Sequence, residues 1–287
     1  MKLIAFLALS LAAGGSAFAQ AAPAAAAAQA PENVAVKNNE SIAFLGDSIT
    51  QYGANMPGGY VRLVISGLKA NGITVTPFPA GISGQHSTEM LERLERDVLS
   101  KKPTWMTLSC GVNDVWHGEK GVPLDAYKAN ITALVDQAQA AGVKVMILTA
   151  TMIGETPDNP NNVKLAAYND FLRELARTKK CSLADVNADM LAAIKPGITG
   201  NQLTCDGVHM NPSGDQVMAA SVLRAFGLND AQLQKARDYW IAMPEIACNV
   251  ECKLPLTLRQ YQKLNELAAK ENLSVLNYLQ KTLSPPK

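Results

Sequence analysis

The chain has 287 residues, of which 48% are hydrophobic and 18% are charged, and its formal net charge is +1. This length suits one domain of ordinary size with additional material, and the composition excludes a disordered or membrane-embedded protein. A net charge so close to zero also argues against a nucleic-acid partner.

Residues 1–19 have the pattern of a secretory signal peptide. An apolar run at 3–13 leads to the small-x-small sequence Ala17-Phe18-Ala19, after which we place the cleavage, with a site after Ala30 as the alternative. The run is about half of the roughly 20 residues that a membrane-spanning helix needs, so we expect no stable membrane insertion. Residues 20–38 begin as an Ala/Pro-rich tract and are expected to be a linker. The sequence therefore predicts a secreted or periplasmic protein.

Residues 39–228 alternate between strand and helix patterns. Short apolar or β-branched runs predict strands at 42–46, 73–78, 104–109, 143–149 and 181–186. Apolar residues at helical spacing predict helices at 60–70, 87–100, 124–141, 163–179 and 212–226. This alternation predicts an α/β domain, in which a parallel sheet carries helices on both faces.

Residues 229–287 are predicted to form a helical C-terminal extension. Pro244 and Pro255 interrupt it, and leucines recur at helical spacing between Thr257 and Leu283. We expect this leucine stripe to dock against the domain, and binding of a partner is the alternative.

Five cysteines can form disulfides if the protein is exported. Cys248 and Cys252 are the pair that we expect, because they are spaced C-x3-C, and Cys181 with Cys205 is a second candidate bridge. Cys110 lies within an apolar stretch and is expected to be a buried thiol. The three histidines lack the spacing of metal ligands, so we expect no metal site and no cofactor, and a metal-dependent phosphoesterase is a poor alternative.

Ser48 is the candidate nucleophile, because Gly46-Asp47-Ser48 lies where the first predicted strand ends. A serine at a strand end can point its hydroxyl into a crevice, and the following turn can offer a backbone N–H to the group that the serine attacks. The alternative is a strand followed by an ordinary Asx or Ser turn.

His209 is the candidate base. It has a carboxylate, Asp206, three residues before it in a short loop. Asp206 would hold one ring nitrogen, and the other nitrogen would accept the proton of Ser48. The alternative is a capping or loop histidine. His86 and His117 follow glycine loops near the inferred crevice, where substrate contact and a surface role are both compatible with the sequence.

Gly84 and Asn113 follow the second and third predicted strands. The carboxyl ends of parallel strands share one edge of the sheet, so these residues can meet Ser48 there. The backbone N–H groups of Ser48 and Gly84 and the side-chain amide of Asn113 could then donate to a developing oxyanion. Each residue alone is also typical of a turn, and their shared position after consecutive strands is what supports the prediction.

Four sequence blocks resemble those of the SGNH hydrolases, also called GDSL esterases, across residues 41–226. They are Gly46-Asp47-Ser48-Ile49-Thr50, the Gly84 loop, Gly111-Val112-Asn113-Asp114 and Asp206-Gly207-Val208-His209. The resemblance implies a three-layer α/β/α sandwich with a five-stranded parallel sheet, a flavodoxin-like arrangement. It also implies that Ser48, Gly84, Asn113 and His209 are the residues that name the family, and that Asp206 completes the triad.

The resemblance implies an ester substrate, either a small molecule or a polysaccharide. Family members act on acetylated polysaccharides, short esters, lysophospholipids and thioesters, and export favours O-acetyl groups on carbohydrate. The loops 53–59 and 116–122 are small, polar and glycine-rich, unlike a long apolar crevice, and a sugar could stack on Trp116. The alternatives are a lysophospholipase or thioesterase and a non-catalytic binding module on the same fold. The sequence leaves the oligomeric state open.

Overall fold

The computed structural model of the chain describes residues 33–198, 200–244 and 256–283. The predicted signal peptide, most of the linker and the Cys248–Cys252 pair lie outside these ranges. The described residues form two compact units, of which the first ends at Pro244.

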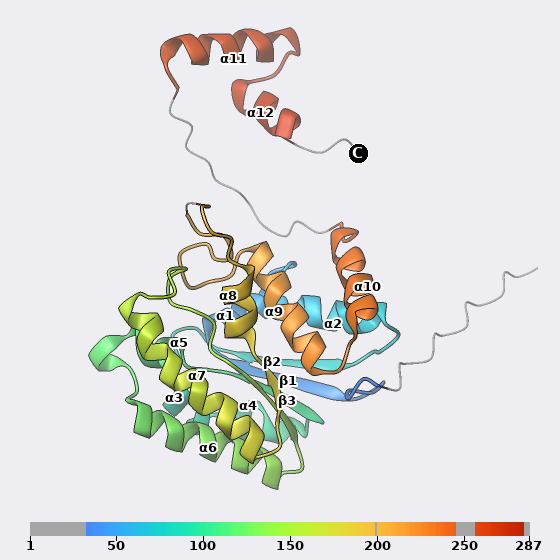
Figure 1. Ribbon diagram of the computed structural model, residues 1–287. Helices are drawn as coiled ribbons and strands as arrows, with labels where there is room; N and C mark the ends of the chain where they lie inside the picture. Colours follow the sequence, from blue (N-terminus) through green and yellow to red (C-terminus); the bar gives the residue numbers. More distant parts are fainter. Residues whose placement is uncertain (1–32, 199, 245–255, 284–287) are drawn as a thin grey trace, which may run out of the picture. The chain divides into compact units, whose positions relative to one another are not determined.

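A parallel sheet of five strands forms the middle of the first unit (Figure 1). The strands lie in the order β2-β1-β3-β4-β5, and each neighbouring pair is parallel. They are β1 (Ser41–Gly46), β2 (Thr76–Gly81), β3 (Trp105–Ser109), β4 (Lys144–Leu148) and β5 (Ser182–Ala184). The central strands β1 and β3 are almost entirely buried, as expected of strands in a sheet that is covered on both faces. The predicted α/β fold is confirmed.

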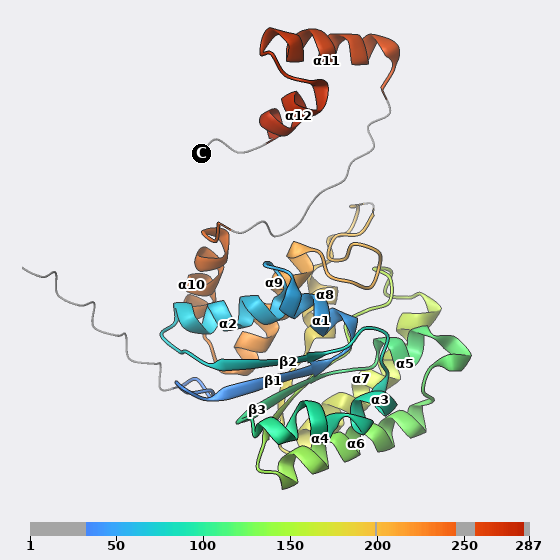
Figure 2. The same ribbon diagram turned by 180° about the vertical axis from the view of Figure 1, so that it is seen from behind.

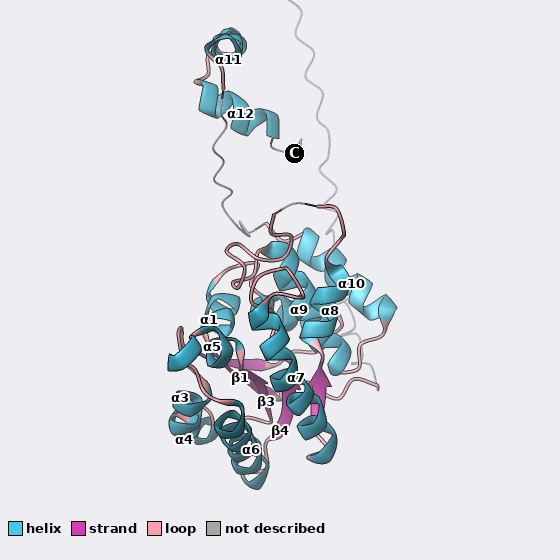
Figure 3. Cartoon of the chain, turned by 60° about the vertical axis from the view of Figure 1, so that its left-hand side comes forward, coloured by secondary structure: helices cyan, strands magenta, loops and turns pink. Residues whose placement is uncertain are grey.

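Two layers of helices enclose the sheet (Figures 2 and 3). One layer contains α1 (Ser48–Asn55), α2 (Tyr60–Ala70), α8 (Val186–Ala193), α9 (Pro212–Ala225) and α10 (Asp230–Ile241). The other contains α3 (Ser87–Glu92), α4 (Leu94–Asp97), α5 (Val112–Trp116), α6 (Leu124–Ala140) and α7 (Pro160–Thr178). Two short 3-10 turns, Leu99–Lys101 and Gly118–Lys120, complete the described elements of this unit.

Several boundaries differ from the prediction. The second strand lies at Thr76–Gly81 instead of 73–78 and includes Pro77 and Pro79, which are tolerated because β2 is an edge strand paired only with β1. The single helix predicted at 87–100 is divided at Arg93 into α3 and α4. Helices α1 and α5 begin within three residues of a strand end, where turns were expected, and α8 begins at Val186, which the prediction assigned to the fifth strand.

Helix α10 lies in the first unit, which ends at Pro244, whereas the prediction placed its residues in the C-terminal extension. Its residues Leu233, Ala236 and Trp240 are buried, and the Trp240 Nε1–H donates to the Leu63 carbonyl in α2 at 3.0 Å. These contacts make α10 part of the helix layer that covers the sheet.

The second unit contains α11 (Leu258–Lys270) and α12 (Val275–Leu283). The two helices contact each other, and Lys281 forms an ion pair with Glu271 at 2.7 Å. Docking of the leucine stripe against the domain stays a prediction.

Cys110 is a buried free thiol, as predicted, and Cys181 is also free. The candidate Cys181–Cys205 bridge is therefore wrong. Cys181 precedes β5 at the amino edge of the sheet, whereas Cys205 lies in the loop before α9 that returns to the carboxyl edge.

Within the described ranges, no helix has the length and apolar character needed to cross a bilayer.

Candidate active site

Ser48 is the first residue of α1 and follows β1 after a one-residue turn. The turn residue, Asp47, caps the helix by accepting the Ile49 N–H at 2.9 Å. A side chain at Gly46 would collide with Thr50, so glycine is required for this abrupt change from strand to helix. The Ser48 side chain is therefore held at the carboxyl edge of the sheet, and the residue is only 7% exposed.

Two hydrogen bonds link Ser48, His209 and Asp206 in series. The His209 Nε2 lies 2.9 Å from the Ser48 Oγ, and the His209 Nδ1 lies 2.7 Å from the Asp206 Oδ2. The Asp206 Oδ1 also accepts the backbone N–H groups of Val208 at 3.0 Å and His209 at 2.8 Å. Burial raises the pKa of the Asp206 carboxyl, but these hydrogen bonds outweigh it and hold that pKa below its ordinary value. An ionised Asp206 fixes the ring so that Nε2 can accept the serine proton.

Asn113 and the Gly84 loop meet beside this series. The buried Asn113 amide donates to the Gln85 carbonyl at 2.9 Å, which fixes its orientation and leaves its second N–H for another acceptor. Gly84 has a φ of +79°, a left-handed conformation that glycine adopts readily. Gln51 in α1 accepts the Ser83 N–H at 2.8 Å, so the Gly84 loop is also bound to the helix that begins with Ser48.

Residues 44–217 match the GDSL-like Lipase/Acylhydrolase family, and this range is more than half of the chain. The chain belongs to that family. It is therefore a carboxylic ester hydrolase, as the four sequence blocks predicted.

Relatives of this GDSL hydrolase include acetylxylan esterases. The acetylxylan esterase of Geobacillus stearothermophilus is 28% identical over 216 residues, which cover 67% of this chain and 96% of that protein. The crystal structure of Axe2, an acetylxylan esterase from the same organism, has a TM-score of 0.61 at 26% identity and covers 68% of this chain and 97% of its own. The structure of the acetyl xylan esterase AlAXEase has a TM-score of 0.58 at 34% identity and covers 64% of this chain and 98% of its own.

A buried arginine supports the serine side of the GDSL hydrolase site. The Arg93 guanidinium donates to the Gly46 carbonyl at 2.9 Å, the Ala80 carbonyl at 2.8 Å and the Gln85 side chain at 2.5 Å. It also lies 3.2 Å from Asp97, which partly offsets the lowering of the Arg93 pKa by burial. Arg93 thus joins the ends of β1 and β2 to the loop that contacts Asn113.

Aromatic and imidazole side chains lie on or next to the elements that carry the site residues. Tyr52, one helical turn after Ser48, places its ring edge against His209 with centroids 5.1 Å apart. Trp116 is 43% exposed, and its ring lies 6.0 Å from that of His117. The His86 Nε2 is 2.8 Å from the His117 Nδ1, so the two predicted loop histidines form a pair. Burial, with His86 next in importance, lowers the pKa of His117.

Across the described part of the chain, no three His, Cys, Asp or Glu side chains are arranged to hold a metal ion.

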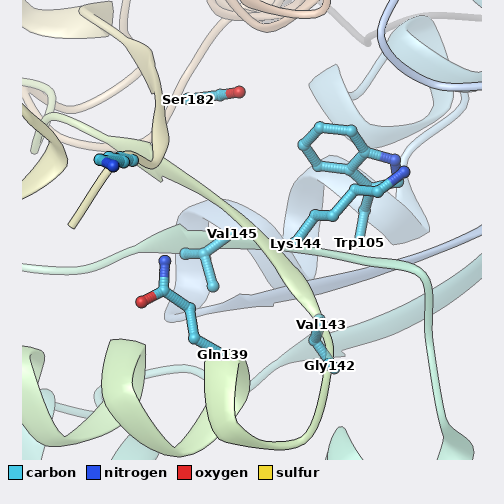
Figure 4. Close-up of a pocket in the computed structure, with 8 residues that line it drawn as sticks. Trp105, Gln139, Gly142, Val143, Lys144, Val145 and Ser182 are labelled. Carbon is cyan, nitrogen blue, oxygen red and sulfur yellow. The ribbon is translucent and has the colours of Figure 1, made fainter.

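A pocket of about 490 Å³ lies at the amino edge of the sheet, opposite the edge that carries Ser48 (Figure 4). Its lining includes Trp105 and Lys144, which both bind Glu40, at 2.9 and 3.1 Å, and it does not include a residue of the Ser48 series. The pocket is thus separate from the candidate active site.

Proposed function

We propose that this GDSL hydrolase removes short acyl groups, above all O-acetyl groups on carbohydrate, through a covalent acyl-enzyme. The observation that carries the proposal is the Ser48–His209–Asp206 series, with distances of 2.9 and 2.7 Å between the interacting atoms. These are the distances at which a base can take a proton from a nucleophile and a carboxylate can orient the base.

In the first half of the reaction, the Ser48 Oγ attacks the ester carbonyl carbon while its proton passes to the His209 Nε2. The resulting oxyanion would accept hydrogen bonds from the N–H groups of Ser48 and Gly84 and from the Asn113 amide. When the tetrahedral intermediate collapses, the C–O bond to the alcohol breaks and His209 returns the proton to the leaving oxygen.

In the second half, His209 takes a proton from water, and the hydroxide oxygen attacks the acyl-enzyme. This attack forms a second tetrahedral intermediate, and its collapse releases the carboxylic acid and returns the proton to Ser48. Asp206 stays ionised throughout and stabilises the imidazolium that forms in each half, which agrees with its depressed pKa.

The carbohydrate part of the proposal draws support from two sources. The relatives reported above are acetylxylan esterases. The exposed Trp116 ring follows Asn113 by three residues on α5 and can stack on an apolar sugar face, while the nearby histidines can hydrogen-bond hydroxyls. We also propose that the protein acts outside the cytoplasm, on the basis of the signal-peptide pattern at residues 1–19.

The test is acetate release from acetylated xylan and other acetylated glycans, compared with hydrolysis of para-nitrophenyl esters of increasing chain length. We expect kcat/KM to be highest for acetyl esters and to fall as the acyl chain lengthens. Ser48→Ala, the control, should lose activity by on the order of a thousandfold or more and keep its melting temperature. A preference for long acyl chains would instead indicate a lysophospholipase or thioesterase.

Labelling with a fluorophosphonate probe distinguishes an enzyme from a binding module. The probe reacts only with an activated serine, so wild type should be labelled and Ser48→Ala should not. An unlabelled wild-type protein would overturn the proposed mechanism.

A further inference from the structure

A carboxylate outside the Ser48 series binds the loop that carries Asp206 and His209. We call residues 202–211 the His-Asp loop. The Glu155 Oε2 accepts the Gln202 N–H at 2.6 Å, and the Oε1 accepts the N–H groups of Leu203 at 2.8 Å and Thr204 at 2.7 Å. The Oε1 also accepts the Thr204 hydroxyl at 2.6 Å. One side chain therefore binds three successive backbone amides at the start of the loop.

The hydrogen bonds continue from Glu155 toward the reacting residues. The Thr204 Oγ1 accepts the Gly207 N–H at 3.1 Å, and Gly207 lies directly after Asp206. Gly154, the residue before Glu155, donates its N–H to the Gly207 carbonyl at 2.6 Å. The loop is closed on itself by the Cys205 N–H, which donates to the His209 carbonyl at 2.7 Å. A displacement of Glu155 would thus be transmitted to both sides of the Asp206 turn.

Glu155 is itself held in place by the first turn of α7. The Asn159 amide donates to the Ile153 carbonyl at 2.7 Å, and the Asn162 amide donates to the Gly154 carbonyl at 2.9 Å. Asn162 also accepts the Ile153 N–H at 2.8 Å. Both amides also donate to the Thr156 carbonyl, at 2.8 and 2.9 Å. The residues on either side of Glu155 are therefore fixed to a helix that packs against β4 and β5.

The contact depends on the negative charge of Glu155. Burial raises the pKa of this carboxyl, but the hydrogen bonds from the Thr204 hydroxyl and from the three amides outweigh it and hold the pKa below its ordinary value. An ionised carboxylate offers two acceptor oxygens to the donors, whereas a glutamine has one acceptor oxygen and would turn an NH2 group toward N–H donors.

We propose that Glu155 is a positioning residue for catalysis: it holds the His-Asp loop so that the His209 Nε2 stays within hydrogen-bond reach of the Ser48 Oγ. The proposal rests on the proposed function. Glu155 does not act on the substrate, and its effect passes through Asp206 and His209.

The test is Glu155→Gln, which keeps the size of the side chain and removes its charge. A displacement of catalytic groups by about 1 Å costs on the order of 100-fold in rate, so we expect kcat for para-nitrophenyl acetate to fall by about 10- to 100-fold, with KM nearly unchanged. Glu174→Gln is the matched control, because Glu174 is an exposed glutamate on α7 whose partner is Arg177. Its kcat should equal that of wild type.

The double variant Glu155→Gln/His209→Ala separates positioning from a general loosening of the fold. If Glu155 acts through the position of His209, its substitution should lower kcat little or not at all once His209 is absent. An equal loss in both backgrounds, or a rise in KM with kcat unchanged, overturns the proposal.

Should Glu155→Gln fail to fold, Thr204→Val removes only the hydroxyl between Glu155 and Gly207, and it should also lower kcat without raising KM. Wild-type kcat in Thr204→Val would then overturn the proposal. An inactive wild-type protein would instead refute the proposed function, so the two failures can be told apart.

Discussion

Replacing Asn113 by alanine should lower both kcat and the free energy of unfolding, because its two amide N–H groups have different roles. The amide has two N–H groups, and one of them donates to the Gln85 carbonyl at 2.9 Å. Loss of the other, as an oxyanion donor, costs about 3 kcal/mol in the transition state, or roughly 150-fold in kcat. Loss of the bond to Gln85 leaves a partly buried carbonyl without its donor, which should lower the free energy of unfolding by about 1–3 kcal/mol.

The assay is steady-state hydrolysis of para-nitrophenyl acetate together with urea unfolding of the same variant. Asn130→Ala is the control, because the Asn130 amide donates to the hydroxyls of Ser87 and Thr88, both at 3.1 Å, just beyond the Gly84 loop. It should alter stability and leave kcat almost unchanged. A rise in KM with constant kcat would identify Asn113 as a substrate-binding residue, and an equal loss of kcat in both variants would refute the oxyanion role.

One further prediction concerns pH. Asp215 accepts the Tyr60 N–H at 2.8 Å, and burial raises its pKa to about 7 from 3.8. As the pH rises from about 4 to about 7, the free energy of unfolding of wild type should therefore fall relative to that of Asp215→Asn, by at most roughly 4 kcal/mol. The same dependence of the free energy of unfolding on pH in both proteins would contradict this.

The parts of the site that the sequence predicted are those defined by short spacings. Asp206 and His209 are three residues apart, and the structure joins them through one ring nitrogen and one backbone N–H. Ser48 directly follows a buried strand, and the edge shared by parallel strands brings it to His209. In both cases local chemistry and one topological rule were sufficient.

Arg93 and Glu155 could not be predicted, because they bind backbone groups far away in the sequence. Arg93 reaches the carbonyl of Gly46, and Glu155 reaches the amides of the segment 202–204. Every residue other than proline has an N–H, and every residue has a carbonyl, so such partners leave no pattern in the side chains. The division of the predicted 87–100 helix at Arg93 was missed for the same reason.

Packing and capping also determine helices that the local sequence did not indicate. The glycine-rich stretch 53–59 suggested a loop after Ser48, yet α1 continues to Asn55 because Asp47 caps it and Ile49 and Thr50 are buried. Helix α10 was assigned to the extension, although Trp240 lies over Gly67 in α2, where a side chain would meet the indole. The sequence does not show that a small residue in one helix packs against a large residue in another, because only the structure reveals their contact.

The two prolines of β2 also protect the sheet from aggregation. Alternate N–H groups of this edge point to β1, as the Thr76 and Ile82 N–H groups do when they donate to Glu40 and Gly46. The intervening positions face outward, and Pro77 and Pro79 occupy two of them, so an incoming strand would find no donor there. The opposite edge, β5, has only three residues. Neither side of the sheet is therefore a good template for intermolecular strand addition, and any self-association of this domain should involve its helical faces.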